Sequence, residues 1–455
     1  MSDRPVVIVS NRGPVSFRED DGELAARRGA GGLVTGLGSL AGRGTTWIAA
    51  AISGGDRVAA TQGGIDTEGF RVRLIAFDPS VYSMAYDVIS NATLWFVHHH
   101  LYDLVRRPRF DRHWATAWDA YRMVNQQFAD VVAEEAPDDA AVLVQDYHLT
   151  LLAPRLRDQR PDLRLVHFSH TPFASPDLLR VLPAEPLTEL LDGMTEHDAC
   201  GFHSGRWAAA FSESCREILD RVPTTFVSPL APDADDLRKS ASSPECAASF
   251  DELDRAVGDR RLIARVDRIE LSKNLLRGFH AFDDLLERYE QWRNEVVFAA
   301  FCYPSREGLP EYLAYRQELE SLVRYLNDKW ATDDWTPILF DSSDDYPRSV
   351  AALRRYDVLM VNPIRDGLNL VAKEGAIVNE HDGLVLLSTE AGAYDELEGV
   401  VRPVNPFDVM GTSDVLASAL AATPEQRRTE SNALRERAQS RSPQTWLADQ
   451  LAAAG

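Results

Sequence analysis

Short runs of consecutive apolar residues recur along the whole chain, separated by segments with a helical spacing of apolar positions. A continuous apolar run of roughly four to eight residues is typical of a strand that is buried on both faces of a sheet. Alternation of such strands with helices predicts parallel sheets covered by helices, an α/β fold. The predicted strands lie at 6–11, 45–51, 72–77, 141–147, 163–170 and 224–230, and then at 260–267, 295–303, 336–340, 357–363 and 383–388.

The segment 229–250 separates the two groups of strands. It is rich in Pro, Ala, Ser and Asp and lacks a sustained period, so it predicts a domain boundary. We therefore expect a domain at 1–228 and a second at 229–440, each built around a doubly wound parallel sheet. The remaining residues, 441–455, contain the amphipathic stretch PQTWLADQL and predict a short helix that could pack on either domain, including back on the first.

Composition supports two sizeable cores and argues against some partners. The chain has 455 residues, of which 45% are hydrophobic, and a formal net charge of −22. Such an acidic chain should repel nucleic acid and anionic membranes, whose affinity depends on Lys and Arg. No apolar run approaches the ~20 residues that span a bilayer, and the start MSDRPVVIVSNR does not resemble a signal peptide. We therefore expect a cytoplasmic protein that binds neither nucleic acid nor membrane.

Candidate metal ligands are few. The four cysteines form no C-x-x-C pair, so neither a disulfide framework nor structural zinc is expected. The histidine tract 98–100 has no accompanying carboxylate, and neighbours in a run seldom converge on one ion. The acidic stretch DADD at 233–236 contains a D-x-D pattern but lies in the boundary segment, which favours a solvated turn. The residues therefore predict no metal and no other cofactor.

Motifs that follow strands carry the candidate chemistry, because ligands in open α/β folds bind at the carboxyl ends of the strands. The first strand is followed by Arg12 and by a glycine segment in which Gly31 and Gly32 open a helical pattern. Glycines there would let backbone N–H groups approach an anion. The spacing fits neither G-x-G-x-x-G nor a P-loop, so a loop without a ligand is an equal alternative.

Two further strands of the first half end in polar side chains, with Asp146 and His148 after one and His170 after the next. A single strand-end His or Asp is more often a helix cap or a satisfied core group. Two successive strand ends of this kind favour a functional role.

In the second half, Arg268 and Lys273 lie where a strand passes through a loop into a helix, and Arg306 follows the next strand. Arg presents a fixed fork to phosphate oxygens and Lys a mobile point charge, so the pair suits a diphosphate. Surface charge is the alternative, although the helix dipole disfavours cations at a helix start unless an anion lies between them.

The ordered motifs SNR, GAGGLVTGLG, NATLW, DYHL, SHTPF, RIELSKN, PSRE and RDGLNLVAKE, spread from position 10 to 374, resemble trehalose-6-phosphate synthases, the retaining glycosyltransferases of family 20. The resemblance implies the GT-B architecture, two Rossmann-like domains that face a central cleft. It also implies transfer of glucose from a nucleotide diphosphate glucose (UDP-, GDP- or ADP-glucose) to glucose 6-phosphate without a metal. The implied mechanism is front-face: the leaving phosphate oxygen takes the acceptor proton, and the protein supplies positioning and electrostatics.

Carried over position by position, the resemblance assigns roles to individual residues. The implied donor-binding residues are Gly32, His170, Arg268, Lys273, Asp366, Asn369, Leu370 and Glu374. The implied acceptor-binding residues are Arg12, Tyr86, Trp95, Asp146 and Arg306. The implied catalytic residues are Asp146, His170, Arg268 and Lys273.

The stretch 365–380, RDGLNLVAKEGAIVNE, places two carboxylates near the start of one helix, which first suggests a general acid and base. The resemblance instead implies two anchors for one nucleotide sugar, with Asp366 on the glucose and Glu374 on the ribose hydroxyls. Lys373 is expected either to neutralise the diphosphate or to be solvated.

Three departures from the family pattern keep alternatives open. Gln145 stands where the family usually shows His, WIAAAISG replaces W-x-G-W-S-G, and RIELSKN replaces RLDYSKG. The last two changes resemble a pseudo-glycosyltransferase that couples cyclitols. The alternatives are therefore a family 20 transferase for another phosphorylated acceptor, such as a glucosylglycerol-phosphate synthase or a cyclitol-coupling enzyme, and a non-catalytic regulatory subunit. A homo-oligomer is possible in each case.

Overall fold

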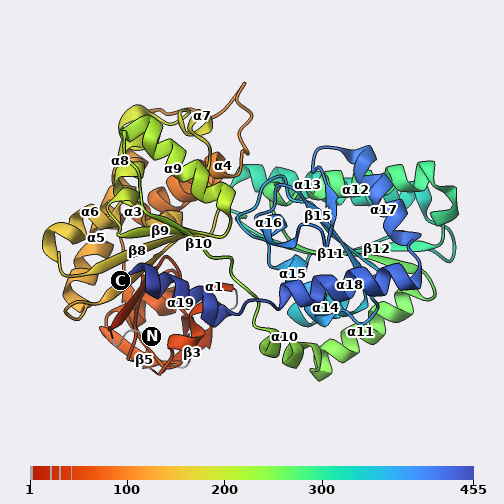
Figure 1. Ribbon diagram of the computed structural model, residues 1–455, viewed down its shortest axis with the longest axis horizontal. Helices are drawn as coiled ribbons and strands as arrows, with labels where there is room; N and C mark the ends of the chain where they lie inside the picture. The colour runs from red at the N-terminus through yellow and green to blue at the C-terminus, as the bar shows by residue number, and fades with distance from the viewer. Residues whose placement is uncertain (1–3, 21–22, 30–31, 43) are drawn as a thin grey trace. The chain divides into compact units, whose positions relative to one another are not determined.

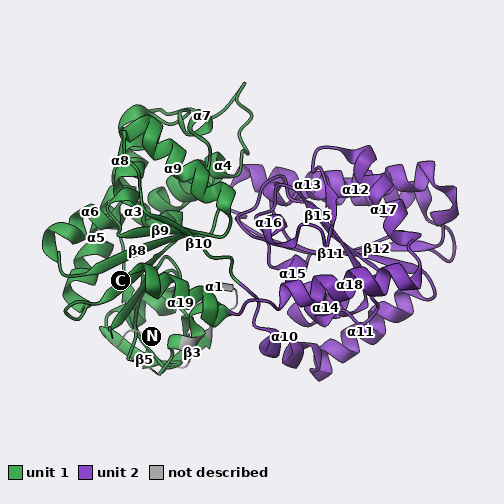
Figure 2. Cartoon of the chain, viewed as in Figure 1, with its two compact units in different colours: residues 1–230, 443–455 green, residues 231–442 purple. Residues whose placement is uncertain are grey.

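The computed structural model of the protein describes residues 4–20, 23–29, 32–42 and 44–455. The chain divides into two compact units, residues 1–230 with 443–455, and residues 231–442 (Figure 2). The sequence placed these divisions two residues earlier, after 228 and after 440. Each unit has an α/β fold, a mainly parallel sheet with helices on its faces, as the apolar pattern predicted (Figure 1).

Unit 1 is built on an eight-stranded sheet in the order β10-β9-β8-β7-β1-β4-β6-β5. The edge strand β5 pairs antiparallel with β6, and the other pairs are parallel. The strands span Val6–Ser10 (β1), Thr46–Ala50 (β4), Gly64–Thr67 (β5), Phe70–Ile75 (β6), Ala141–Gln145 (β7), Arg164–Ser169 (β8), Ala199–Phe202 (β9) and Thr225–Val227 (β10). The short strands β2 (Val15–Asp20) and β3 (Glu23–Arg28) form a separate antiparallel pair.

The strands that follow β1 in the sequence lie on both sides of it in the sheet, and this arrangement sets the position of the unit 1 motifs. From β1 the chain continues to β4 and β6 on one side, and it then returns to β7, β8, β9 and β10 on the other. The strand order therefore reverses between β1 and β7. Ligands of doubly wound sheets bind at the carboxyl ends of the strands at such a reversal. Arg12 and Asp146 follow these two strands, so the fold brings both to this edge.

Unit 2 is built on a six-stranded parallel sheet in the order β13-β12-β11-β14-β15-β16. The strands span Arg261–Ile269 (β11), Val296–Pro304 (β12), Ile338–Asp341 (β13), Val358–Val361 (β14), Leu384–Ser388 (β15) and Arg402–Val404 (β16). Here the order reverses between β11 and β14, which pair in parallel through Ile263 and Ala264. The segments after these strands carry Lys273 and Asp366, so the predicted donor residues also lie at a reversal point.

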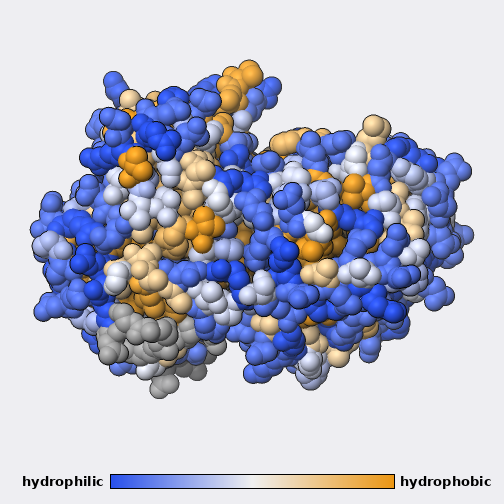
Figure 3. Space-filling view, in the orientation of Figure 1, coloured by the Kyte–Doolittle hydropathy of each residue, from blue (hydrophilic) through white to orange (hydrophobic). Residues whose placement is uncertain are grey.

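Buried apolar side chains explain both sheets. Strands β1, β4, β7 and β15 are buried almost throughout, as continuous apolar runs require. Long amphipathic helices cover them, including α5 (Arg112–Glu135) in unit 1 and α13 (Pro310–Trp330) in unit 2. Among the described residues no helix is both long and apolar enough to cross a membrane. Figure 3 shows a mainly hydrophilic surface on the face in view, with small separated apolar patches.

The predicted boundary segment 229–250 is not irregular, which corrects the sequence analysis. It forms α10 (Ala234–Ala241) and the first half of α11 (Pro244–Val257). The acidic stretch contains a helix start rather than a solvated turn, because the Asp233 side chain accepts from the backbone N–H groups of Asp235 and Asp236. Its mixture of Ser, Pro and Asp therefore reflects helix caps and first turns.

The C-terminal helix α19 (Pro443–Ala453) belongs to unit 1 and packs against α1 (Gly32–Leu37) and β8. Trp446 is fully buried, with its ring 5.1 Å from that of Phe168. Gly36 passes so close to Trp446 that a Cβ atom would lie 2.8 Å from the indole, so only glycine fits there. The chain thus returns to unit 1 after completing unit 2.

Candidate active site

In unit 1 a row of aromatic rings begins beside Arg12. The Tyr82 hydroxyl donates to Asn11 Oδ1 at 3.0 Å. Burial raises the pKa of this phenol, whereas the charge of Arg12 acts to lower it. Tyr82 stacks on Tyr86, with centroids 5.6 Å apart, and Tyr86 stacks on His148 at 5.8 Å. The row therefore connects the SNR motif to the DYHL motif.

The same row continues to Trp95. His148 stacks on Tyr147 at 4.1 Å, the Tyr147 ring lies 5.9 Å from Trp95, and Trp95 stacks on His99 at 3.7 Å. Tyr86 lies in a π-helix, Met84–Leu94, that leads directly into α4 (Trp95–His98). Such π-helical turns are frequent at functional sites. The row therefore links the predicted acceptor residues Tyr86 and Trp95 through His148 and Tyr147, and Arg12 is an electrostatic neighbour of Tyr82 in the same row.

Asp146 follows β7 in a backbone conformation that side chains rarely adopt. Its φ is +70° and its ψ 170°, a region populated almost only by glycine. The backbone N–H of Asp146 donates to Phe168 O at 2.8 Å, and its carboxylate accepts from the backbone N–H of His170 at 3.2 Å. These contacts hold the strained residue at the edge of the sheet, and such strain is typical of functional sites.

Both ring nitrogens of His170 have partners inside unit 1. Nε2 lies 3.0 Å from Gln145 Oε1, and Nδ1 lies 3.2 Å from His203 Nε2. Burial, and then the neighbouring His167, lower the pKa of His170 to about 3. The ring is therefore neutral at pH 7. Of the glycine segment, Gly32 begins α1, whereas Gly31 lies outside the described residues.

In unit 2 the predicted donor residues form a connected cluster. Lys273 Nζ lies 2.7 Å from Asp366 Oδ2 and 3.5 Å from Asp267. Asn369, in a left-handed conformation with φ +78°, donates from Nδ2 to Asp366 Oδ2 at 3.2 Å. Burial would lower the pKa of Lys273, but Asp366 and Asp267 outweigh it and raise that pKa. Lys273 thus remains a cation in a buried position.

Arg268 and Arg306 share one carboxylate, which the sequence analysis did not identify as a site residue. Glu270 Oε1 lies 2.7 Å from Arg268, 2.5 Å from Arg306 and 2.9 Å from Ser305 Oγ. Burial opposes the charge of Glu270, but the two arginines hold its pKa at about 2. Arg306, predicted on the acceptor side, therefore lies in unit 2 beside the donor residue Arg268. The contact of Glu270 with Arg306 depends on the pairing of β11 with β12, which the sequence alone does not show.

Glu374 and Lys373 are neighbours on α15 (Val371–Val378) with different surroundings. Leu370 is the N-cap of this helix, and its carbonyl accepts from the backbone N–H groups of both residues at 2.9 Å. Burial raises the pKa of Glu374 to about 7, with Lys273 opposing. Lys373 is fully buried and pairs with Glu396. It therefore neither faces solvent nor lies free to bind phosphate, which corrects both expectations for it.

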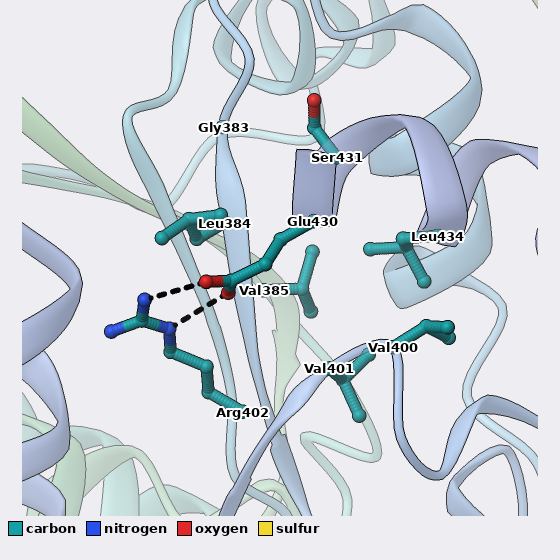
Figure 4. Close-up of a pocket in the computed structure, with 9 residues that line it drawn as sticks. All are labelled: Gly383, Leu384, Val385, Val400, Val401, Arg402, Glu430, Ser431 and Leu434. Atoms are coloured by element: carbon teal, nitrogen blue, oxygen red, sulfur yellow. Dashed lines mark hydrogen bonds and ion pairs between the residues drawn. The ribbon is translucent and has the colours of Figure 1, made fainter. Parts of the chain in front are cut away.

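Other features of the described residues do not form this site. A small pocket beside β15 and β16 is lined mainly by apolar side chains and by the doubly hydrogen-bonded Arg402–Glu430 pair, which already satisfies its own charges (Figure 4). Within the described part of the chain, no three His, Cys, Asp or Glu side chains gather as a metal site. In the histidine tract, His98 accepts from the backbone of Ala174, and His99 stacks on Trp95.

Two Rossmann-like sheets, with a cluster of cations and carboxylates at the reversal point of the second, are the features of a GT-B glycosyltransferase. The chain belongs to glycosyltransferase family 20, whose model matches residues 4–454. This match confirms the resemblance seen in the motifs, and with it the enzyme class.

Relatives and solved structures agree with this assignment. The chain is 32% identical to trehalose-6-phosphate synthase of Mycolicibacterium smegmatis, covering 99% of this chain and 92% of the relative. It is 30% identical to an alpha,alpha-trehalose-phosphate synthase [UDP-forming] of Dictyostelium discoideum, over 93% of this chain but only 58% of that longer protein.

Among solved structures, an E. coli trehalose-6-phosphate protein bound with UDP-2-fluoro glucose matches with a TM-score of 0.88 and 26% identity, over 99% of this chain and 98% of that one. A Burkholderia xenovorans alpha,alpha-trehalose-phosphate synthase (UDP-forming) in complex with glucose-6-phosphate matches with a TM-score of 0.85 and 27% identity, over 99% of both chains.

Proposed function

We propose that the protein is a retaining glucosyltransferase of trehalose biosynthesis, which moves glucose from a nucleotide diphosphate glucose to glucose 6-phosphate and releases trehalose 6-phosphate and nucleoside diphosphate. The observation that carries this proposal is the cluster of Arg268, Lys273 and Asp366 at the reversal point of unit 2, in a chain of family 20. The names of its relatives favour a uridine donor.

In unit 2, Arg268 and Lys273 would hold the donor diphosphate. Both cations are kept charged by carboxylates, Arg268 by Glu270 and Lys273 by Asp366. Preorganised cations in a buried site stabilise the charge that develops on a leaving phosphate. Asp366 and Asn369 would bind the glucose hydroxyls, and Glu374 would accept from the ribose hydroxyls. Leu370, at the start of α15, would offer its backbone.

In unit 1, Arg12, Tyr86 and Trp95 would bind the acceptor, and in unit 2 Arg306 is proposed for an acceptor phosphate. The support for the two rings is the aromatic row that links them. Asp146 would contact the reacting sugars from its strained position. Gly32 would bring backbone close to the donor phosphates.

The proposed reaction needs no protein nucleophile and no proton-transferring side chain. His170 is neutral and has partners on both ring nitrogens, which fits a positioning role rather than general base catalysis. In a front-face reaction the leaving phosphate oxygen takes the acceptor proton, and the enzyme contributes orientation and electrostatics. We further propose that no metal or other cofactor is required, that the enzyme acts in the cytoplasm and that it forms a homo-oligomer.

A donor and acceptor panel tests the proposal. Purified protein is incubated with UDP-, GDP- or ADP-glucose and glucose 6-phosphate, with and without EDTA, and nucleoside diphosphate release is measured. We expect turnover, unaffected by EDTA, with at least one donor. Failure with every donor would overturn the proposal, and binding of a nucleotide sugar without turnover of any acceptor would indicate a regulatory subunit.

A different phosphorylated acceptor is the second candidate, and one observation favours it. The stretch WIAAAISG keeps Trp47 but lacks the second Trp of many family members, and its Ala50, at the carboxyl end of β4, donates from its backbone N–H to Asn11 O at 3.2 Å. A small side chain therefore stands beside the residue that precedes Arg12. Glycerol 3-phosphate and cyclitol phosphates in the same panel decide between the two acceptor classes.

A further inference from the structure

A chain of hydrogen bonds crosses the interior of unit 1 and ends on the C-terminal helix. The backbone N–H of Leu230 donates to His203 Nδ1 at 3.3 Å, and His203 Nε2 lies 3.2 Å from His170 Nδ1. His170 Nε2 lies 3.0 Å from Gln145 Oε1, and Gln145 Nε2 lies 3.1 Å from Gln450 Oε1. The two glutamines are separated by 305 positions in the sequence.

The backbone N–H of Leu230 fixes which atom donates and which accepts in every later hydrogen bond of this series. A backbone N–H can only donate, so His203 Nδ1 carries no proton and its Nε2–H donates to His170 Nδ1. His170 must then carry its proton on Nε2 and donate it to Gln145 Oε1. The remaining amide group of Gln145 needs an acceptor in this buried place, and Gln450 supplies it. Each link allows only one orientation of the next.

The helix that carries Gln450 also touches the glycine-segment helix. Gln450 is fully buried, and one turn earlier Trp446 lies 5.8 Å from the His170 ring. The same indole leaves no room for a Cβ atom at Gly36 of α1. Asp449 accepts from Ser228 Oγ at 2.7 Å and anchors the helix further. One helix therefore supports both elements of unit 1 that the donor proposal uses.

Within the described part of the chain, few titratable groups face His170. They are His203 on one ring nitrogen, the Asp146 carboxylate on its backbone N–H, and His167 from β8, whose own pKa burial lowers to about 3. The remaining neighbours are the amide of Gln145 and the apolar rings of Phe168 and Trp446. The Asp146 carboxylate is the one group among them whose charge favours a second proton on the ring, and burial outweighs it, because the pKa of His170 is lowered.

We propose that Gln450 is a positioning residue of the active site: by accepting from Gln145 Nε2 it holds the Gln145 oxygen on the Nε2–H of His170 and so keeps the ring of this neutral tautomer in place. The kinetic consequence rests on the proposed function, whereas the tautomer does not. An imidazole held in this way keeps one ring orientation, with both ring nitrogens occupied. Gln145 stands where the family usually has His, so this amide relay distinguishes the chain from that pattern.

Nitrogen-15 NMR of the full-length protein, selectively labelled at histidine, tests the tautomer without any substrate. The His170 signals are assigned with His170→Gln. We expect a protonated Nε2 and an unprotonated Nδ1 that do not change between about pH 5 and 8, where an ordinary histidine titrates. A proton on Nδ1, or titration within that window, would overturn the proposal.

Three variants of α19 separate positioning from packing. Gln450→Leu removes the acceptor, Gln450→Glu keeps an oxygen acceptor at the same place, and Leu447→Ala removes buried packing without touching the relay. We expect Gln450→Leu to disturb the His170 signals and to lower kcat by roughly tenfold, and Gln450→Glu to restore both. Leu447→Ala should lower Tm but leave the His170 signals unchanged. If Gln450→Leu and Leu447→Ala give the same signals and the same kcat, Gln450 contributes packing alone and the proposal fails.

If no donor supports turnover, the proposed function fails, and the NMR comparison of the same variants still decides the tautomer. If turnover is found and the His170 signals do not respond to Gln450→Leu, the function stands and the relay is wrong. The two failures are therefore distinguishable.

Discussion

Lys273 Nζ lies 2.7 Å from Asp366 Oδ2, so the residue proposed for the diphosphate is paired with the residue proposed for the glucose. Asp366→Asn keeps the shape but removes the charge that holds Lys273 in place. We expect kcat/KM for the donor to fall at least about tenfold, since hydrogen bonds to charged groups contribute roughly 1.5–3 kcal/mol. Both limbs of the pH profile should remain. Asp284→Asn, which removes a helix-surface pair with Arg288, is the matched control.

Arg268→Ala removes a cation proposed to stabilise the leaving diphosphate. By analogy with the loss of one oxyanion donor, kcat should fall about 100- to 1,000-fold. The fall in kcat is measured by steady-state kinetics at saturating donor. Arg316→Ala, which removes an arginine of similar exposure paired with Glu307 and Glu320 on α13, should leave kcat unchanged. Near wild-type kcat/KM for Arg268→Ala would show that the diphosphate is bound elsewhere.

Glu270→Gln should affect both substrates, because its carboxylate holds Arg268 and Arg306 together. Without that charge the two guanidinium groups repel each other and share only a neutral amide oxygen, so KM should rise for donor and for acceptor alike. Glu270→Asp keeps the charge on a side chain one methylene shorter, so it should raise the two KM values by less than Glu270→Gln does. A change confined to donor KM would show that Arg306 does not serve the acceptor phosphate.

Glu374 should make folding stability depend on pH. Burial raises its pKa from 4.5 to about 7, so the folded protein holds a proton that the unfolded chain has already lost in this interval. Its contribution to the free energy of unfolding is therefore fully present below pH 4.5 and is lost as the pH rises through 7. Denaturant titrations across this range measure the slope.

The control for this pH dependence is Glu374→Gln, which removes the ionisable group while keeping its size. Its free energy of unfolding should lack the decline that the wild-type protein shows between pH 4.5 and 7. Identical slopes in the two proteins would mean that the carboxyl group titrates normally. In the wild type, nucleoside diphosphate binding near pH 7 should also release protons, because ribose hydroxyls favour the ionised carboxylate.

Lys373→Ala should destabilise unit 2, because it leaves the Glu396 carboxylate buried without its cation. Breaking one half of a buried pair costs about 3–5 kcal/mol, measured as the free energy of unfolding. Lys373→Met combined with Glu396→Leu should recover most of this loss, since no charge is then left unpaired. A single variant as stable as the wild type would contradict the buried ion pair.

The pattern of apolar runs predicted the main strands because these strands are buried on both faces. Strands β5, β9 and β16 of the two main sheets escaped prediction. The sequence GIDT of β5 is half-exposed and has one large apolar residue, ACGF of β9 offers two small residues within a buried four-residue strand, and RPV of β16 begins with a cation and a proline. The boundary helices α10 and α11 escaped because their caps use the residues that also signal loops.

The candidate site could be predicted as far as its residues follow strands. Arg12, Asp146 and Lys273 lie next to strand ends in the sequence, so the topology alone brings them to the reversal points. Glu270 and Gln450 carry no such local signal. Glu270 becomes significant only because β12 brings Arg306 beside it, and Gln450 because a helix from the far end of the chain meets β7. Contacts of this kind depend on packing between distant segments.

The return of α19 to unit 1 also orders events during synthesis. Unit 1 begins at the start of the chain, yet Trp446 and Gln450 leave the ribosome only after all of unit 2 has been translated. Domains generally fold as they emerge, N-terminal first. Until α19 arrives, the nascent unit 1 exposes the apolar surface of Phe168 and an unsatisfied Gln145 amide. The first unit to be started is therefore the last to be completed.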